Sequence, residues 1–308
     1  MKKQNPIVGR FFVLLSSFLW GTALVYTQYV LDNGITSKDL VSMKMFFGFL
    51  TLALYIIFVD RSLFNVKLKG LIGFAVAGFF CHTLYNLFVF RAIEYTSIPV
   101  SVVLLYTAPI YVTFFSRIIF KERITYLKIL ALLLCIFGAY LSVTGGTISK
   151  NEISFIGVLY GLGSGLCYGL TTILNKTFSK DYSQITILVY TFGFAFLFSL
   201  LFSNPMALFS QSYKPLVYVF IIMLGIFSTA LSYVFYVKGL ILGVEPTTAS
   251  IIATLEVPIS VIGSVIVFGQ KLSKIEIFGI ILVFLSIVIL NVKLNLKTLK
   301  KQKINTHF

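Results

Sequence analysis

A single carboxylate stands inside a long apolar run in the second half of the chain. In the stretch ATLEVPIS, residues 253–260, Glu256 lies about ten residues into the run and two positions before Pro258. Proline has no amide hydrogen, so the carbonyl four residues earlier, that of Thr254, is expected to lack its helical partner. The carboxylate and this carbonyl could hold a proton or an ammonium group. The alternative is a protonated Glu256 that ties its helix to a neighbour.

A second polar cluster interrupts the apolar residues 70–91. His82 is accompanied by Tyr85 and Asn86 at positions i+3 and i+4, so the three side chains are expected to share one helix face. A neutral imidazole there could bind a ligand or pass protons. The alternative is a hydrogen bond between helices.

Lys44 is a cation that lies inside an apolar run, about a quarter of the way into residues 40–59. Its ammonium group could extend to the membrane interface, as lysine side chains often do, or could bind a carboxylate. Aromatic residues that could wall a cavity with these groups are Trp20, Tyr26, Tyr106, Tyr168, Tyr233 and Tyr236.

The composition identifies the elements that position these groups. Of 308 residues, 58% are hydrophobic and 11% are charged, against about 25% charged in soluble domains. Runs of roughly 20 apolar residues can cross a bilayer as helices, and an acid at the bilayer centre costs about 2.5–3.5 kcal/mol. We therefore predict an all-α polytopic membrane protein. Its ten transmembrane helices are expected at about 11–31, 40–59, 70–91, 98–120, 125–144, 154–174, 185–203, 215–238, 246–268 and 275–292.

The net charge of +15 follows the loops that this arrangement predicts. With the N-terminus in the cytoplasm, the inner segments hold 18 Lys and Arg residues and the outer segments hold 6. Cationic loops stay on the cytoplasmic side, so we expect a multi-pass plasma membrane protein with both termini inside. The charge is then a topology signal rather than a nucleic-acid site, and the basic tail Lys293–Lys303 is expected to contact the membrane surface.

No cofactor or metal site is indicated by the sequence. Cys81, Cys135 and Cys167 all fall inside apolar runs and are expected to be small buried residues without disulfides. A membrane metalloprotease needs two histidines in an HExxH-type pair, and only His82 lies in a run. Paired intramembrane aspartates and a TVGYG-type ion filter are also missing from the sequence, so a membrane enzyme and an ion channel are disfavoured.

The chain repeats itself after about 148 residues. Trp20-Gly21 then falls on Tyr168-Gly169, Tyr85 falls on Tyr233, and FKERIT (120–125) falls on FGQKLS (268–273). Within one or two positions Pro99 meets Pro246 and Pro109 meets Pro258, while Gln270 stands where the first half has Glu122. We predict two five-helix repeats, residues 1–148 and 149–308. Five is odd, so the second repeat is inverted, an arrangement typical of secondary transporters with a midplane site.

Four glycines recur at every fourth position of the sixth apolar run, at Gly157, Gly161, Gly165 and Gly169. Such a face lets a neighbouring helix approach closely. We expect it to pack inside the chain, with homodimerisation as the alternative. Pro109 and Pro258, both in the middle of a run, are expected to be hinges.

These patterns resemble the EamA-type family of the drug/metabolite transporter superfamily. LWGTA (19–23) is similar to its first-helix signature, and residues 100–124 and 247–273 are similar to its fourth-helix pattern of a central proline followed by a short charged turn. The resemblance covers nearly the whole chain. It departs from the family at Lys44, where arginine is common, and at Gln270, where glutamate is usual.

The resemblance implies a secondary transporter that works by alternating access and carries a small amphipathic metabolite, such as an amino acid or a related compound, out of the cell. The expected partners are the substrate, the lipid bilayer and protons as coupling ion, with the protein a monomer or a homodimer. The candidate cavity residues are Trp20, Lys44, His82, Tyr85, Asn86, Tyr106, Tyr233, Tyr236 and Glu256. Uptake instead of export, and a drug-like or sugar-like substrate, are open alternatives.

Overall fold

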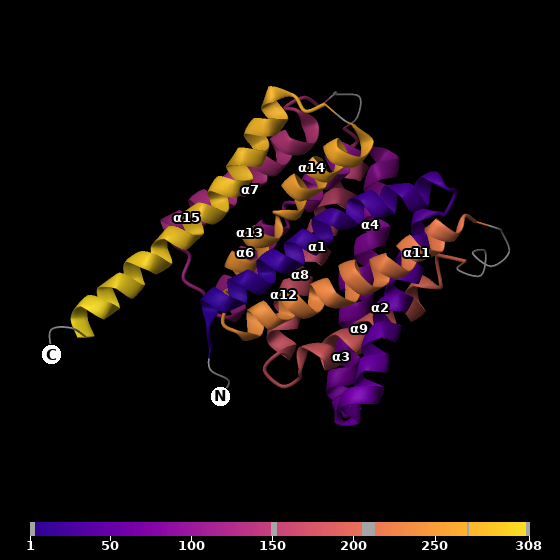
Figure 1. Cartoon of the computed structure of the whole chain (residues 1–308), viewed down its shortest axis with the longest axis horizontal. Coiled ribbons are helices and arrows are strands. Elements are labelled where there is room, and N and C mark those ends of the chain that lie inside the picture. Colours follow the sequence, from indigo (N-terminus) through magenta and orange to yellow (C-terminus); the bar gives the residue numbers. More distant parts are fainter. Residues whose placement is uncertain (1–3, 149–152, 205–212, 270, 306–308) are drawn as a thin grey trace.

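The computed structural model describes residues 4–148, 153–204, 213–269 and 271–305, with side chains described up to residue 290. Within these ranges the regular elements are all helical (Figure 1). The first half holds α1 (Pro6–Asp32), α2 (Ser37–Val59), α3 (Leu68–Gly78), α4 (Tyr85–Tyr95), α5 (Ile98–Leu105), α6 (Ala108–Ile119) and α7 (Tyr126–Thr144). The second holds α8 (Phe155–Phe178), α9 (Gln184–Ser199), α11 (Pro215–Met223), α12 (Ser232–Ile241), α13 (Pro246–Ala253), α14 (Glu256–Phe268) and α15 (Lys274–Asn305).

Local sequence signals set several helix starts. The Thr36 hydroxyl accepts a hydrogen bond from the Asp39 amide at the start of α2, and the Ser97 hydroxyl accepts one from the Val100 amide at the start of α5. Such caps satisfy amides that have no partner in the first helical turn. Proline occupies the first turn of α1, α5, α6, α11 and α13, where its missing amide hydrogen costs little.

The membrane-spanning stretches agree with most of the predicted runs. Eight stretches of the described chain are long and apolar enough to cross a membrane. The seventh predicted run forms the shorter α9, which has 16 residues. The tenth forms α15, whose side chains beyond residue 290 are outside the described part, as is the contact predicted for the basic tail. The total of ten spans therefore stays a prediction.

The order of elements in the first half recurs in the second. The starts of α6 and α14, and those of α7 and α15, are each 148 residues apart. Both halves also interrupt one span with a π-helix, at Phe79–Leu84 in the first half and at Leu224–Leu231 in the second. The repeat detected in the sequence is thus a repeat of structural elements.

Two predicted spans are each broken at mid-length. The run at 98–120 divides between α5 and α6, and the run at 246–268 divides between α13 and α14, so each proline lies in the first turn of a second half-helix. The prediction that the Thr254 carbonyl lacks a partner is wrong. This carbonyl accepts a hydrogen bond from the Val257 amide at 3.0 Å, because the chain turns tightly where the two half-helices meet.

The core lies where the two halves pack together. Phe74 of α3, Phe192 of α9 and Val237 of α12 are completely buried in one cluster that also includes residues of α2. On the other side of the bundle α15 lies along α7 and extends beyond the remaining helices (Figure 1). The three cysteines are buried and free, as predicted.

Candidate cavity between the two halves

A large cavity opens between the two halves of the bundle. It has a volume of about 600 Å³ and extends from residues near the end of α14 and the start of α15 to the broken helices at its floor. We call it the central cavity. Its lining includes Trp20, Lys44, His82, Pro99, Tyr85, Tyr106, Tyr168, Ser228, Tyr233, Glu256, Val261, Ser264, Lys271 and Glu276.

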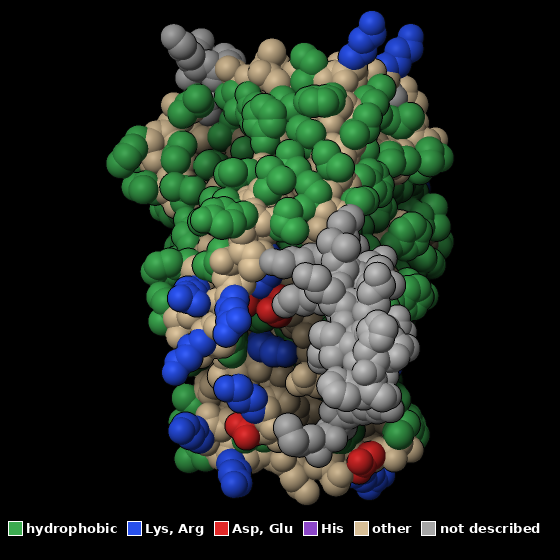
Figure 2. All heavy atoms as spheres, turned by 90° about the vertical axis from the view of Figure 1, so that its left-hand side faces the viewer, with side chains coloured by type: hydrophobic (Ala, Val, Ile, Leu, Met, Phe, Trp, Pro, Cys, Tyr) green, Lys and Arg blue, Asp and Glu red, His purple; other side chains and the backbone are tan. Residues whose placement is uncertain are grey.

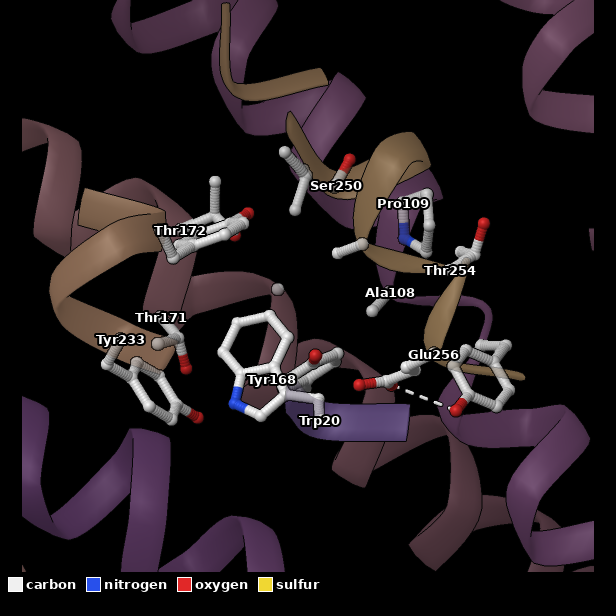
Figure 3. Close-up of a pocket in the computed structure, with 15 residues that line it drawn as sticks. Trp20, Ala108, Pro109, Tyr168, Thr171, Thr172, Tyr233, Ser250, Thr254 and Glu256 are labelled. Carbon is white, nitrogen blue, oxygen red and sulfur yellow. Dashed lines mark hydrogen bonds between the residues drawn. The ribbon is translucent and has the colours of Figure 1, made fainter. Parts of the chain in front are cut away.

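Glu256 lies at the floor of the central cavity, at the point where the two helix breaks meet. It is the first residue of α14, and Tyr106 is the residue that ends α5. The Tyr106 hydroxyl donates a hydrogen bond to Glu256 Oε1 at 2.9 Å (Figure 3). The breaks thus bring a carboxyl group of one half against a phenol of the other.

Trp20 lines both the floor of the central cavity and a much smaller space of about 20 Å³ beside it. Its indole lies between Tyr233 and Glu256 (Figure 3), and its ring centroid is 4.9 Å from that of Tyr233. The indole Nε1 donates to the Ser228 carbonyl at 3.0 Å. Since Ser228 belongs to the second π-helix, the irregular backbone supplies the acceptor that orients the indole.

The smaller space is lined by hydroxyl groups beneath an aromatic rim. Thr172 Oγ1 and the Tyr236 hydroxyl are 2.7 Å apart, and either group could be the donor. The remaining hydroxyl-bearing residues of this lining, apart from the tyrosines shared with the central cavity, are Thr171, Ser250 and Thr254. Polar side chains therefore continue from Glu256 toward the end of the bundle opposite the mouth of the central cavity.

Lys44 and His82 line the wall of the central cavity above its floor. Among the residues that the structure describes, Lys44 Nζ has no hydrogen-bond or ion-pair partner, so its ammonium group is available to a ligand. His82 is 2% exposed and belongs to the first π-helix. Its ring packs against Phe192 and Tyr233, each with centroids 5.3 Å away.

Three residues from the sequence-based set lie outside the lining of the central cavity, and one of them, Tyr236, lines only the smaller space. Asn86 lines a separate small pocket with Lys38 and Thr83, and its amide donates to the His82 carbonyl at 2.6 Å. Tyr26 packs against Phe220, with ring centroids 5.2 Å apart. The face predicted from His82, Tyr85 and Asn86 therefore divides, because the π-helix rotates the residues that follow it.

Several lining groups were not singled out from the sequence. The sequence did not indicate the two π-helices, and it did not single out the hydroxyl groups of Thr171, Thr172 and Ser250. Adjacent threonines inside an apolar run, such as Thr171 and Thr172, are a signal that could have indicated the smaller space. No comparable sequence signal marks a π-helix.

The glycine face of α8 packs against the broken span of the first half. A Cβ atom at Gly161 would lie 2.4 Å from Leu104 Cδ1, and one at Gly165 would lie 2.7 Å from Thr107 Oγ1. Gly157 faces Thr96, and Gly169 faces the Ala108 carbonyl. The glycines are thus used for close packing inside the chain, as the sequence predicted.

Comparison with known proteins decides the family. Residues 7–144 and 155–292 each match the EamA-like transporter family. The chain belongs to this family. An uncharacterized transporter of Archaeoglobus fulgidus is 28% identical over 271 residues, which cover 88% of this chain and 92% of that protein. The uncharacterized inner membrane transporter YicL of Salmonella typhimurium is 23% identical over 289 residues, 92% of this chain and 95% of its own length.

The fold is also found in a crystal structure that shares 14% sequence identity. It aligns with a TM-score of 0.76 over 92% of this chain and 96% of the other. This EamA-family chain is therefore a transporter with the family's two-repeat architecture.

Proposed function

We propose that this transporter exports a small amphipathic zwitterion, an amino acid or a related compound, across the plasma membrane by alternating access. Glu256 would bind the ammonium group, Lys44 would bind the carboxylate, and Trp20 and Tyr168 would contact the apolar part. The observation that carries the proposal is that Glu256 and Lys44 line one cavity together with aromatic rings. An intramembrane acid and an intramembrane base are each expensive to bury, which favours a functional use.

The orientation follows from the charges. The end of the bundle that carries the N-terminus also carries Arg10, Lys121, Arg123, Lys128 and Lys176 around a second cavity. The positive-inside rule places such an end in the cytoplasm. Both termini are then cytoplasmic, the central cavity faces outward, and ten helices form two inverted five-helix repeats.

Proton coupling is assigned to Glu256. A carboxyl group at the floor of the central cavity can exchange a proton with the outside, and it can bind either a proton or a substrate ammonium. Competition between these two occupants would couple an inward proton movement to outward transport. In this scheme the Tyr106 hydroxyl orients the carboxyl group in both states.

The test is transport into inside-out vesicles under an imposed pH gradient, with a panel of amino acids, a sugar and a lipophilic cation. Glu256→Gln keeps size and most hydrogen bonds but cannot ionise, so we expect normal insertion and a loss of gradient-driven uptake of about tenfold or more. Glu256→Asp should be impaired less. Glu94→Gln is the matched control, since Glu94 is half-exposed and pairs with Arg91 at 2.8 Å. A wild-type rate and pH dependence in Glu256→Gln would reduce the carboxyl group to a tie between helices.

Lys44 has its own test within the same assay. Lys44→Met should raise KM about tenfold or more for a carboxylate substrate, because a hydrogen bond to a charged group is worth about 1.5–3 kcal/mol. The corresponding amine without the carboxylate should be transported equally by both proteins. Equal KM values for the carboxylate substrate would assign Lys44 to the membrane interface instead.

A further inference from the structure

The end of the bundle opposite the central cavity is hollowed and strongly charged. Figure 2 shows Lys and Arg side chains gathered around a hollow at the end that carries the N-terminus, with acidic side chains among them. This second cavity has a volume of about 780 Å³, and we call it the basic cavity. Its lining includes Arg10, Glu122, Arg123, Lys128, Lys176, Glu245, Pro246 and Thr248.

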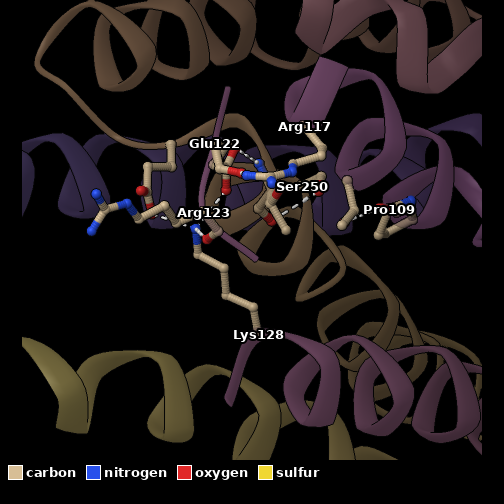
Figure 4. A network of polar contacts seen from close by, with 9 residues as sticks. Pro109, Arg117, Glu122, Arg123, Lys128 and Ser250 are labelled. Carbon is tan, nitrogen blue, oxygen red and sulfur yellow. Dashed lines mark hydrogen bonds and ion pairs between the residues drawn. The ribbon is translucent and has the colours of Figure 1, made fainter. Parts of the chain in front are cut away.

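Lys128 is the centre of an ion-pair network in the basic cavity. Its Nζ atom is 2.6 Å from Glu122 Oε1 and 2.7 Å from Glu245 Oε2, and it also donates to the Arg123 carbonyl at 3.0 Å (Figure 4). The side chains of Lys128 and Glu122 are only 9% and 3% exposed. We call Lys128, Glu122 and Glu245 the Lys128 network.

The Lys128 network joins the two repeats. Lys128 and Glu122 belong to the start of α7 and the loop before it, whereas Glu245 immediately precedes α13 in the second repeat. Glu122 Oε2 also accepts from the Thr247 amide at 3.4 Å. Motion of α13 away from the α6–α7 loop would break the Lys128–Glu245 ion pair and the hydrogen bond from the Thr247 amide to Glu122, while the Lys128–Glu122 pair stays within the first repeat. Loss of a partner is unfavourable for a charge as buried as Lys128.

The 148-residue repeat places counterparts of the Lys128 network at the mouth of the central cavity. These counterparts differ in chemistry from the members of the network. Ser97 and Glu245 hold the same position, immediately before the first residues of α5 and α13, and Glu276 is the third residue of α15 as Lys128 is the third residue of α7. In sequence, Gln270 matches Glu122. Lys271 matches Arg123, which contributes its carbonyl to the Lys128 network.

Glu276 has a purely local role at the mouth. Its Oε2 atom accepts from the Ser273 amide at 2.6 Å, and the Ser273 hydroxyl accepts from the Glu276 amide at 3.2 Å. This reciprocal pair is a capping box for α15. A closed mouth would therefore bring Ser97 and Glu276 together with no cation in the place that Lys128 occupies at the other end.

The two broken spans connect these ends in opposite directions. The span of α5 and α6 begins at Ile98, beside the central cavity, and ends at Ile119, next to Phe120 in the lining of the basic cavity. The span of α13 and α14 begins at Pro246, beside the basic cavity, and continues to Ser264, beside the central cavity. At each end of the molecule, the start of a broken span from one repeat thus faces a loop of the other repeat.

We propose that the Lys128 network holds the basic end closed and that its absence from the matching positions at the mouth biases the resting transporter toward the state with an open central cavity. The proposal rests on alternating access, one part of the proposed function, and on no particular substrate. An ion pair between the repeats at one end, with no such pair among the described residues at the matching positions of the other end, gives the two states unequal stability, which is what sets a two-state population.

Thiol labelling of two reporters measures this population without a substrate. In a background lacking Cys81, Cys135 and Cys167, Ser264→Cys reports the central cavity and Thr248→Cys, at a residue 2% exposed, reports opening of the basic cavity. In purified protein, Lys128→Met should raise the maleimide rate at position 248 by about tenfold and lower it at position 264. Arg123→Met, which removes an equal charge from the same cavity, should leave both rates unchanged.

A double variant at the mouth tests the proposal while leaving the Lys128 network unchanged. Ser97→Glu with Glu276→Lys builds the matching ion pair at the mouth, so labelling at position 264 should fall and labelling at position 248 should rise. Ser97→Gln with Glu276→Lys supplies the cation without its acid and should show little shift. This pair decides the matter if Lys128→Met is not monodisperse.

The proposal is overturned if folded Lys128→Met labels like Arg123→Met, or if the engineered pair labels like its Gln control. Because labelling needs no substrate, a shift in these rates together with unchanged transport by Glu256→Gln would reject only the assigned role of Glu256.

Discussion

Replacement of Gly161 tests whether close packing of α8 on α5 positions the floor of the central cavity. A Cβ atom at Gly161 would lie 2.4 Å from Leu104 Cδ1 and 2.7 Å from Leu104 Cβ, well inside contact distance. Overpacking of this kind costs about 1–3 kcal/mol, and alanine regains about 0.8–1.0 kcal/mol of helix propensity over glycine. We expect a net loss of about 0–2 kcal/mol for Gly161→Ala and more for Gly161→Leu.

The assay is thermal unfolding in detergent together with transport per folded molecule. A loss of about 1 kcal/mol lowers the midpoint by roughly 2–4 °C in chains of about 150–250 residues, and by somewhat less in this chain of 308 residues. Leu104 lies two residues before Tyr106, so displacement of α5 should also weaken the bond to Glu256 and reduce transport. Gly263→Ala is the matched control, because a Cβ there meets only Val25 Cγ2, at 3.3 Å.

A compensating substitution separates packing from other effects. Leu104→Ala removes Cδ1, the atom closest to the new Cβ, together with Cγ, although Leu104 Cβ at 2.7 Å stays. The double variant should therefore be more stable than the sum of the two single changes by about 0.5–3 kcal/mol. Wild-type midpoint, abundance and transport in Gly161→Leu would refute the reasoning, since no rearrangement would then be needed to admit the larger side chain.

Two further changes test the topology and the orientation of Trp20. A single cysteine at Ser273 should react with an impermeant thiol reagent applied to intact cells and one at Arg61 should not; labelling at position 61 would contradict the charge-based topology. Trp20→Phe removes the hydrogen bond to the Ser228 carbonyl, worth about 0.5–1.5 kcal/mol, so KM should rise about two- to tenfold; an unchanged KM would make the indole nitrogen irrelevant to substrate binding.

Much of the fold follows from signals that act locally along the chain. Apolar runs, proline positions and the 148-residue repeat predict the spans, the two interruptions and the matched halves, because each depends on residues close in sequence or on a fixed shift. The glycine face of α8 is predictable for the same reason, since absence of a side chain is itself the packing signal. Its partner, the broken span of α5 and α6, is not predictable from spacing alone.

The site was less accessible to sequence reasoning because it depends on local backbone irregularity. His82, Tyr85 and Asn86 share a face only in a regular α-helix, and the π-helix at Phe79–Leu84 changes that register. Likewise, a standard helix would leave the Thr254 carbonyl without a partner, but the tight turn there gives it the Val257 amide. Such rearrangements depend on packing between helices that are distant in sequence.

The two helix breaks are equivalent in position and different in chemistry. α6 begins at Ala108 and α14 begins at Glu256, residues 148 positions apart, so only the second break carries a carboxyl group. Tyr106 from the first break donates to that carboxyl group, which therefore touches both repeats although it belongs to one. Motion of one repeat against the other must change this contact. The occupant of Glu256, proton or ammonium, can therefore favour one arrangement of the repeats over the other, which is the requirement for coupling binding to movement.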